Sequence, residues 1–232
     1  MTSDTRNIKK FFSEIQMTKR VKHEGVRLAG VEFPDSIADH SCVAAQIAFV
    51  LAELEGCDPF KAAAMNLFHD NHECRIGDHH KISSRYIDSH AAEEKAENEH
   101  FSNLSDGLAK KTTSLLNEKR QRNSKEGVIA QDADWLEMAF QAKIYAERGY
   151  AGSMDWFKNV EEAVETPSAK KILKLVKEDD DFTNCWWRGL KKQTHKKLES
   201  SWGKSFEARV SRYLVLSSNL ASSKEILRCL QA

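Results

Sequence analysis

The sequence has few of the residues that interrupt helices. Only three prolines and ten glycines occur among its 232 residues. Segments that alternate apolar and polar residues, as half-buried strands do, are scarce. Apolar residues recur instead at three- and four-residue spacings, which is the period of an amphipathic helix. These features predict an all-α fold.

The sequence also lacks an excess of charge and a long hydrophobic run. Lys plus Arg equals Asp plus Glu, at 35 each. Global charge therefore gives no reason to expect binding to nucleic acid or to a membrane. No apolar run approaches the roughly 20 residues that a membrane span needs, and the N-terminus has no hydrophobic signal core. We expect neither a nucleic-acid nor a membrane partner.

Cysteine occurs without a disulfide pattern. The five cysteines form no CxxC pair, and their number is odd. This usage is typical of reduced thiols rather than of a disulfide framework. We therefore expect a cytoplasmic protein.

The length is sufficient for one well-buried domain with an appendage. Helical spacing predicts helices over residues 6–18, 36–55, 59–72, 90–104, 106–121, 127–148 and 167–178. Asp58-Pro59 and Thr166-Pro167 combine a capping residue with proline at the first helical position. The stretch 73–90 is predicted to be a turn and loop, and 153–165 is a polar stretch. A change in composition near residue 180 predicts a core over 1–180 and a helical C-terminal extension over 181–232.

The residues that indicate chemistry are His40, the adjacent pair His69-Asp70, and Asp134. Two imidazoles and two carboxylates can bind one divalent metal and leave positions for water and substrate. The His-Asp pair ends an apolar helix, where polar residues need a partner or a metal because their burial is costly. Neighbouring helical residues point about 100° apart, so both can reach one ion only near the helix end.

Three segments carry a family resemblance. HDNHECRIGD at 69–78 resembles the signature HDxxExxxGD, and DSIADHS at 35–41 resembles ESVADHS. QDADWLEM at 131–138 resembles DxDxxEM. In this order and spacing, the segments resemble the HD-domain phosphohydrolases of the 5′-deoxynucleotidase-like group. The resemblance covers roughly residues 5–165 and implies an HD-domain helical bundle.

The resemblance implies that His40, His69, Asp70 and Asp134 are the metal ligands. It implies one divalent ion, which could be Mn, Co, Zn, Fe or Mg. Asp132 is a competing carboxylate, but it lies two residues from Asp134 and so on a different helix face. We therefore expect Asp132 to cap or orient rather than to coordinate.

The same signature contains two further carboxylates with expected roles in catalysis. Glu73 follows His69 by four residues and Asp70 by three, so a continuing helix would present it on their side. The resemblance assigns Glu73 a catalytic role, and such a position suits a general acid or base. It also implies that Asp78 positions the sugar or the attacking water.

Arg20 resembles the arginine of the KRxxRxG segment of this family. A fixed guanidinium can bind phosphate through two hydrogen bonds, so we expect Arg20 to bind the substrate phosphate. The family often has a second arginine where this chain has His23. Lys19, Lys22 or Arg27 could compensate for this departure.

Together these features predict a metal-dependent phosphomonoesterase that removes phosphate from (deoxy)nucleoside 5′-monophosphates. The alternatives are an HD-domain hydrolase of nucleoside triphosphates or another phosphorylated metabolite, a dinuclear-iron HD oxygenase, and a non-catalytic nucleotide-binding HD protein. Further histidines leave a second metal site open; they are His72, His79, His80, His90 and His100. We also expect a homo-oligomer, most simply a dimer.

Overall fold

The structure, a computed structural model, describes residues 2–190. Its α-helices are α1 (Thr2–Ile15), α2 (Ile37–Glu55), α3 (Pro59–Phe68), α4 (Glu73–Ile76), α5 (Ser89–Phe101), α6 (Asp106–Gln121), α7 (Lys125–Glu147), α8 (Met154–Ala163) and α9 (Pro167–Glu178). Residues 2–190 contain no strand, only an isolated antiparallel bridge between Lys22 and Ser36. The predicted all-α fold is therefore confirmed.

The chain divides into two compact units, residues 1–183 and 184–232. All helices from α1 to α9 belong to the first unit. The predicted helical extension over 181–232 stays a prediction, because residues 191–232 lie outside the described residues.

Side-chain caps determine where three of the helices begin. Ser36 and Asp39 form a reciprocal capping box at the start of α2, in which each side chain accepts a hydrogen bond from the backbone N–H of the other residue. Asp58 caps α3, and Pro59 occupies its first turn, as expected. Thr166 caps α9 in the same way. These starts follow from local sequence alone.

Helices α3, α4 and α8 differ from the sequence-based expectation. The short helix α4 lies in a stretch that was expected to be only a turn and loop. Helix α3 ends at Phe68, four residues earlier than predicted, because the chain leaves it through tight turns in which Asn71 N donates to Phe68 O at 3.2 Å. Helix α8 was expected to be only a polar stretch. It is an amphipathic helix that buries Phe157 and Val160, and Met154, Phe157 and Val160 follow one another at three-residue spacing.

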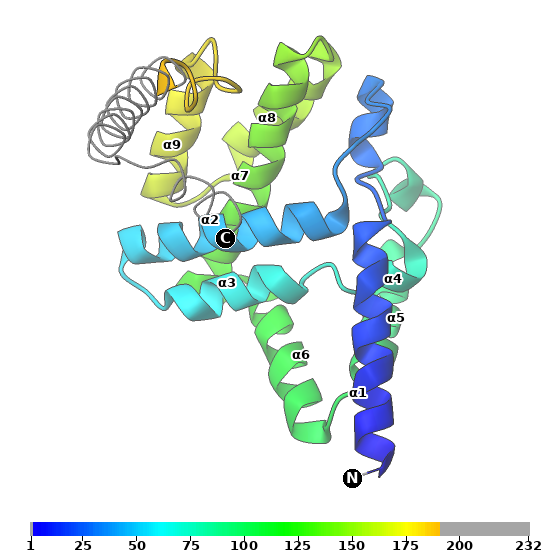
Figure 1. Ribbon diagram of the computed structural model, residues 1–232. Helices are drawn as coiled ribbons and strands as arrows, with labels where there is room; N and C mark the ends of the chain where they lie inside the picture. Colours follow the sequence, from blue (N-terminus) through cyan, green and yellow to red (C-terminus); the bar gives the residue numbers. More distant parts are fainter. Residues whose placement is uncertain (1, 191–232) are drawn as a thin grey trace, which may run out of the picture. The chain divides into compact units, whose positions relative to one another are not determined.

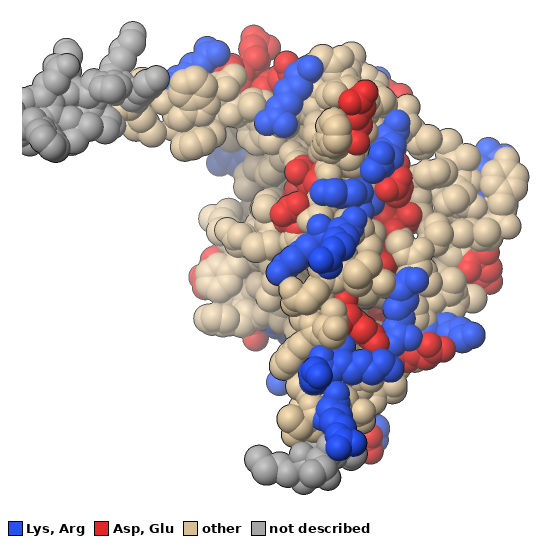
Figure 2. Space-filling view, turned by 45° about the vertical axis from the view of Figure 1, so that its right-hand side comes forward, with Lys and Arg blue, Asp and Glu red and all other residues tan. Residues whose placement is uncertain are grey.

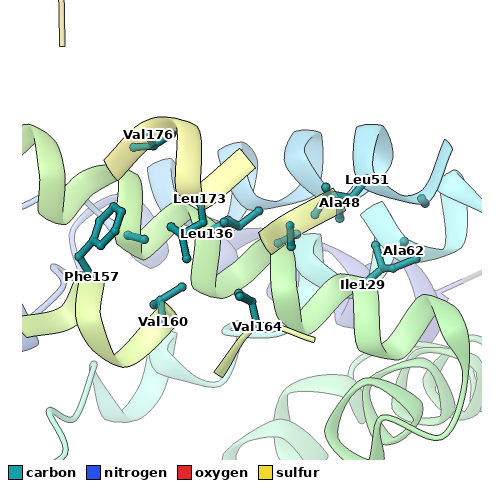
Figure 3. Packing of buried hydrophobic residues seen from close by; sticks show 14 of the residues in the cluster. Ala48, Leu51, Ala62, Ile129, Leu136, Phe157, Val160, Val164, Leu173 and Val176 are labelled. Atoms are coloured by element: carbon teal, nitrogen blue, oxygen red, sulfur yellow. The ribbon is translucent and has the colours of Figure 1, made fainter. Parts of the chain in front are cut away.

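The main core lies between α2, α3, α7, α8 and α9. Helices α2 and α3 run antiparallel side by side, and α7 crosses them (Figure 1). Figure 3 shows the buried side chains that meet there. The larger of these are Leu51, Ile129, Leu136, Phe157, Val160 and Leu173. This packing places the start of α2, the end of α3 and the middle of α7 close together.

Helix α2 is long and apolar enough to cross a membrane, with a mean hydropathy of 1.4 over an 18-residue window. The sequence-based expectation concerned uninterrupted apolar runs, and α2 is not one, because Asp39, His40 and Gln46 lie among its apolar residues. Its position explains its composition: Ala44, Ala48, Leu51 and Ala52 are buried, and the helix packs against both α3 and α7. A central core helix reaches such hydropathy because it contacts other helices on several sides.

Two small features hold the helices in register. The buried Asn66 side chain donates to Ala44 O at 3.2 Å and to Ala130 O at 3.0 Å, which ties α3 to α2 and to α7. A Cβ atom at Gly127 would lie 2.7 Å from Glu118 O. Only glycine therefore permits this close approach of α6 and α7.

The surface carries mixed charge. On the face shown in Figure 2, Lys and Arg side chains lie next to Asp and Glu side chains. Ion pairs such as Arg27–Glu24 at 2.9 Å and Lys177–Glu161 at 2.7 Å join some of the exposed charges. Such pairs contribute little stability each.

Candidate metal centre

Four side chains that the sequence singles out converge on one point. The Nε2 atoms of His40, in the first turn of α2, and His69, just after α3, lie 3.4 Å apart. Asp134 of α7 places Oδ1 at 3.2 Å from His40 Nε2 and Oδ2 at 3.5 Å from His69 Nε2. Asp70 Oδ2 lies 3.0 Å from His69 Nε2 and 3.7 Å from His40 Nε2. We call these four residues the metal centre.

Both imidazoles are oriented by a contact at Nδ1, the ring nitrogen that faces away from the metal centre. His40 Nδ1 lies 2.5 Å from Oε2 of the buried Glu137, and His69 Nδ1 lies 2.9 Å from Asn66 O. A carbonyl oxygen can only accept a hydrogen bond, so His69 carries its proton on Nδ1. Each Nε2 then points its lone pair towards the centre, which is the arrangement that metal-binding histidines show.

The carboxylate of Asp134 is also oriented by an ion pair with a buried lysine. Lys119 of α6 is 5% exposed, and its Nζ lies 2.7 Å from Asp134 Oδ2. Gln131 Nε2 donates to the same oxygen at 3.2 Å. The close crossing of α6 and α7 at Gly127 lets Lys119 reach this carboxylate.

The metal centre attracts positive charge. Burial of the imidazole opposes protonation, but hydrogen bonds to Asp134 and Glu137 raise the pKa of His40 well above its usual value. Burial likewise opposes ionisation of Asp134, yet the Lys119 charge and the two histidines hold its pKa well below the usual range. Burial opposes ionisation of Asp70 too, and His69 lowers its pKa. A divalent ion here would compete with protons for the histidines.

The donor set fits a divalent metal. His40, His69 and Asp134 place ligand atoms within 4.8 Å of one another, and Asp70 adds a second carboxylate beside them. Two imidazole nitrogens and two carboxylate oxygens suit borderline ions such as Zn, Mn, Fe and Co.

The metal centre opens into a pocket of about 470 Å³, within the usual size range of small-molecule sites. Its apolar wall consists of Val26, Leu28, Ile82, Trp135, Met138, Trp156, Val160 and Ala163. Glu73 and Asp78 line its polar side. Asp78 Oδ2 accepts a hydrogen bond from Glu24 N at 2.7 Å, which fixes one of its oxygens.

Glu73 has an unusual environment. It begins α4, and only 9% of it is exposed. Burial, with the negative charges of Asp70 and Asp78, raises the pKa of Glu73 to about 11. This environment favours the protonated carboxyl group.

Arg20 lies apart from these residues. Its side chain is exposed, and it is not among the residues that line the pocket. Besides His40 and His69, the basic residues that line the pocket are His23, His79, His80 and Lys81. The His23 ring centroid lies 4.5 Å from that of His40, and burial and the His40 charge lower the pKa of His23.

Asp132 lies outside the metal centre, although it is two residues from Asp134. It accepts hydrogen bonds from Glu165 N at 3.0 Å and from both Thr166 N and Thr166 Oγ1 at 2.7 Å. Its carboxylate fixes the chain at the start of α9. This position agrees with the capping role expected for it.

Sequence reasoning did not identify Glu137 and Lys119. Glu137 had a usable signal, because it follows Asp134 by three residues and so shares its helix face. Lys119 had none, since it is one of several lysines in a polar helix and its partner lies 15 residues away.

Comparison with known proteins identifies the family of the chain. A family model described as HD domain matches residues 15–177. The 5′-deoxynucleotidase HDDC2 of Dictyostelium discoideum is 30% identical over 152 residues, which cover 61% of this chain and 79% of the relative. The 5′-deoxynucleotidase HDDC2 of Bos taurus is 28% identical over 143 residues, covering 61% and 69%. A conserved hypothetical protein from Pyrococcus furiosus superposes with a TM-score of 0.61 at 28% identity, covering 73% of this chain and 99% of that one.

Proposed function

This chain belongs to the HD-domain phosphohydrolases, in their 5′-deoxynucleotidase-like group, and we propose that it removes phosphate from deoxynucleoside 5′-monophosphates. The observation that carries the proposal is the convergence of His40, His69, Asp70 and Asp134 at the wall of a pocket that also contains Glu73. A metal-binding donor set beside a protonated carboxyl group is suited to phosphate-ester hydrolysis.

We propose that the metal centre holds one divalent ion. Such an ion, when bound, polarises a phosphoryl oxygen and lowers the pKa of water. Lys119 would hold Asp134 in place and Glu137 would hold His40, so that these ligands reorganise little when the ion binds.

Glu73 is the proposed proton donor. Burial and the neighbouring carboxylates raise its pKa, which favours the protonated form that can donate. When water attacks phosphorus, the nucleoside 5′-oxygen leaves and takes up this proton. The attacking water loses a proton in the same reaction, and that proton can restore Glu73. Asp78, fixed by Glu24 N, is the proposed contact to the sugar.

The phosphate also needs positive charge from the protein. Arg20 stays a prediction for this role, but its exposed side chain would have to move to reach the pocket. Lys81 lines the pocket as it stands. We therefore propose Lys81 as a phosphate contact beside the metal.

Substrate choice rests on pocket shape and on the names of the relatives. Trp135 and Trp156 on the pocket wall offer broad apolar surfaces that suit a nucleobase without selecting one. A carboxylate such as Asp78 could accept the 3′-hydroxyl and leave little room for a 2′-hydroxyl. We expect deoxynucleoside 5′-monophosphates to exceed ribonucleotides in kcat/KM, with weak preference for the base.

A phosphate-release assay of the purified chain tests the proposal. The substrates are deoxynucleoside and ribonucleoside 5′-monophosphates, 3′-monophosphates and triphosphates, each with Mn²⁺, Co²⁺ or Mg²⁺. The expected order places 5′-deoxynucleotides first and 3′-monophosphates last. Comparable rates for 3′- and 5′-monophosphates, or hydrolysis confined to triphosphates, would contradict it.

We also propose a homodimer. The side chains of Val43, Val50 and Leu54 are exposed on one face of α2, and Phe60 and Leu67 of α3 are exposed as well. Apolar surface of this kind is typical of protein contacts. Light scattering should give a mass of twice 26.4 kDa; a monomer mass would refute the dimer.

A further inference from the structure

The segment that follows Asp78 brings basic side chains to the pocket. His79, His80 and Lys81 are consecutive, and all three line the pocket. They lie between Asp78 and Asp88, which caps α5. Among residues 2–190, the hydrogen bonds of 79–87 are all formed within 79–89. The turns of the segment itself therefore determine how its side chains are oriented.

The imidazole of His80 is held by such a turn. Ser83 N donates a hydrogen bond to His80 Nδ1 at 3.1 Å, and Ser83 Oγ donates to His80 O at 2.7 Å. A backbone N–H can only donate, so Nδ1 is the acceptor and the ring proton is on Nε2. The turn thus fixes the tautomer of His80 and restrains its ring.

The second ring nitrogen of His80 is available to a ligand. The residue is partly exposed, and Nε2 has no hydrogen-bond partner among residues 2–190. His79 lines the same pocket, but no contact within the described part of the chain fixes its ring. An N–H donor that is already oriented loses little freedom when a ligand accepts its hydrogen bond. His80 is therefore better prepared for binding than His79.

The chemistry of this segment suits an anion. Among the described residues that line the pocket, Lys81 is the single Lys or Arg, and it follows His80 directly. The tryptophans of the apolar wall, Trp135 and Trp156, belong to α7 and α8. A nucleobase and a phosphate would thus contact different elements. Phosphate oxygens accept hydrogen bonds from N–H groups, and such charge-assisted bonds are roughly twice as strong as bonds between neutral groups.

We propose that His80 is a phosphate-binding residue, which donates its Nε2–H to a phosphoryl oxygen beside Lys81. His80 lies outside the three segments that carry the family resemblance, so the contact is a feature of this chain's own sequence. That the phosphate belongs to a 5′-nucleotide rests on the proposed function, but the contact itself concerns the phosphate group alone.

Binding of inorganic phosphate to the full chain loaded with Zn²⁺ tests the proposal without turnover. Isothermal titration measures the affinity. His80→Ala should weaken phosphate binding about 10–100-fold, the effect of losing a hydrogen bond to a charged group. Its affinity for a deoxynucleoside, which has no phosphate, should equal that of wild type. Wild type that binds no phosphate, or equal phosphate affinity in wild type and His80→Ala, would overturn the proposal.

Matched variants separate the hydrogen-bond donor from the shape of the side chain. The amide nitrogen of glutamine lies near the position of histidine Nε2, so His80→Gln should retain most of the phosphate affinity. The amide of asparagine lies nearer to Nδ1, so His80→Asn should bind phosphate as weakly as His80→Ala. His90→Ala removes a histidine whose side chain is 96% exposed, and it should bind phosphate as wild type does. A loss in His80→Gln as large as in His80→Ala would contradict the assigned donor.

Nitrogen NMR of labelled histidines gives a readout that a merely structural role would not change. In the Zn²⁺-loaded chain, His80 should have a protonated Nε2 and an unprotonated Nδ1. Saturating phosphate should shift the Nε2 resonance of His80 and leave that of His90 in place. An unshifted His80 resonance would overturn the proposal.

The result is distinguishable from failure of the proposed function. A chain that binds phosphate through His80 but releases phosphate from no nucleotide would refute the proposed function and support the role of His80. A chain that hydrolyses 5′-nucleotides, with the same KM and phosphate affinity in wild type and His80→Ala, would support the function and refute the role of His80.

Discussion

Two clusters of histidine and carboxylate in this protein differ in how their charge is balanced. In the first, which we call the Glu14 cluster, Glu14 of α1 accepts a hydrogen bond from His100 Nδ1 at 2.6 Å. It also accepts hydrogen bonds from Arg75 of α4, with both carboxylate oxygens at 2.9 Å from Nη2. Arg75 in turn binds Glu99 at 2.8 Å. Each charge in this cluster has an opposite charge beside it.

The metal centre and its neighbours lack this balance. Their carboxylates are Asp70, Glu73, Asp78, Asp134 and Glu137. Among residues 2–190, Lys119 is the single Lys or Arg that forms an ion pair with any of them. The Glu14 cluster thus pairs its charges internally and holds the short helix α4 in place, whereas the metal centre is left with an excess of negative charge. The comparison separates a polar cluster that stabilises the fold from one that is built to bind.

The largest effect should come from removing a ligand of the metal centre. Asp70→Ala should lose bound metal and reduce phosphate release to the level of the buffer control, because the remaining ligands provide too little negative charge. Chelation of wild type should have the same effect, and added Mn²⁺ or Co²⁺ should restore activity. Elemental analysis and the phosphate assay measure both. Full activity of metal-free protein would refute the metal-dependent mechanism.

Glu73→Gln should separate proton transfer from metal binding at the metal centre. The variant keeps the shape of the side chain but cannot donate an acidic proton, so kcat should fall about 10²–10⁴-fold. The ion held by His40, His69 and Asp134 should remain bound. If Glu73→Gln turns over like wild type, the assignment of the proton donor is wrong even though the family assignment stands.

Lys119→Met tests whether the buried lysine holds Asp134 for the metal. Loss of this contact should weaken metal binding about 10–100-fold, the usual effect of changing a partner of a ligand. Isothermal titration with Mn²⁺ measures the affinity. Lys61→Met is the matched control, since Lys61 pairs with Glu118 at 2.5 Å but contacts no predicted ligand. Unchanged affinity in Lys119→Met would refute the role.

Glu14→Gln should affect stability and leave metal binding unchanged. Burial opposes ionisation of Glu14, but His100 and Arg75 lower its pKa below the usual value. The ionised carboxylate therefore stabilises the fold, and the variant should lose about 1.5–3 kcal/mol of unfolding free energy at neutral pH. Glu99→Gln, at an exposed partner of Arg75, should lose less.

The pH dependence of this difference follows from the lowered pKa. Above the pKa of an unfolded glutamate, about 4.3, the stabilisation from Glu14 is fully present. It declines as the pH falls towards the lower pKa of the folded state. Urea unfolding at several pH values should therefore show wild type and Glu14→Gln converging in acid. A constant difference at all pH values would exclude the ionic contribution.

Local sequence determined the helical elements and the chemistry of the site. The starts of α2, α3 and α9 were predictable because Ser36, Asp58 and Thr166 cap within a few residues of their own position. The candidate ligands were identifiable because imidazoles and carboxylates are scarce in apolar helices. Helix α8 was missed although Met154, Phe157 and Val160 recur at three-residue spacing, because the charged residues between them made the segment resemble a polar stretch.

Only the tertiary structure determined the contacts between segments that are distant in the sequence. Glu137 turns His40 towards the metal centre, and Lys119 reaches Asp134 across the contact at Gly127. Arg20 lies outside the pocket, although its segment matches the family pattern. The sequence by itself therefore determined which residues can bind a metal and where helices begin. Only the packed helices decided which oxygen each histidine contacts and which carboxylates have no positive partner, because these distances depend on how α2, α6 and α7 cross.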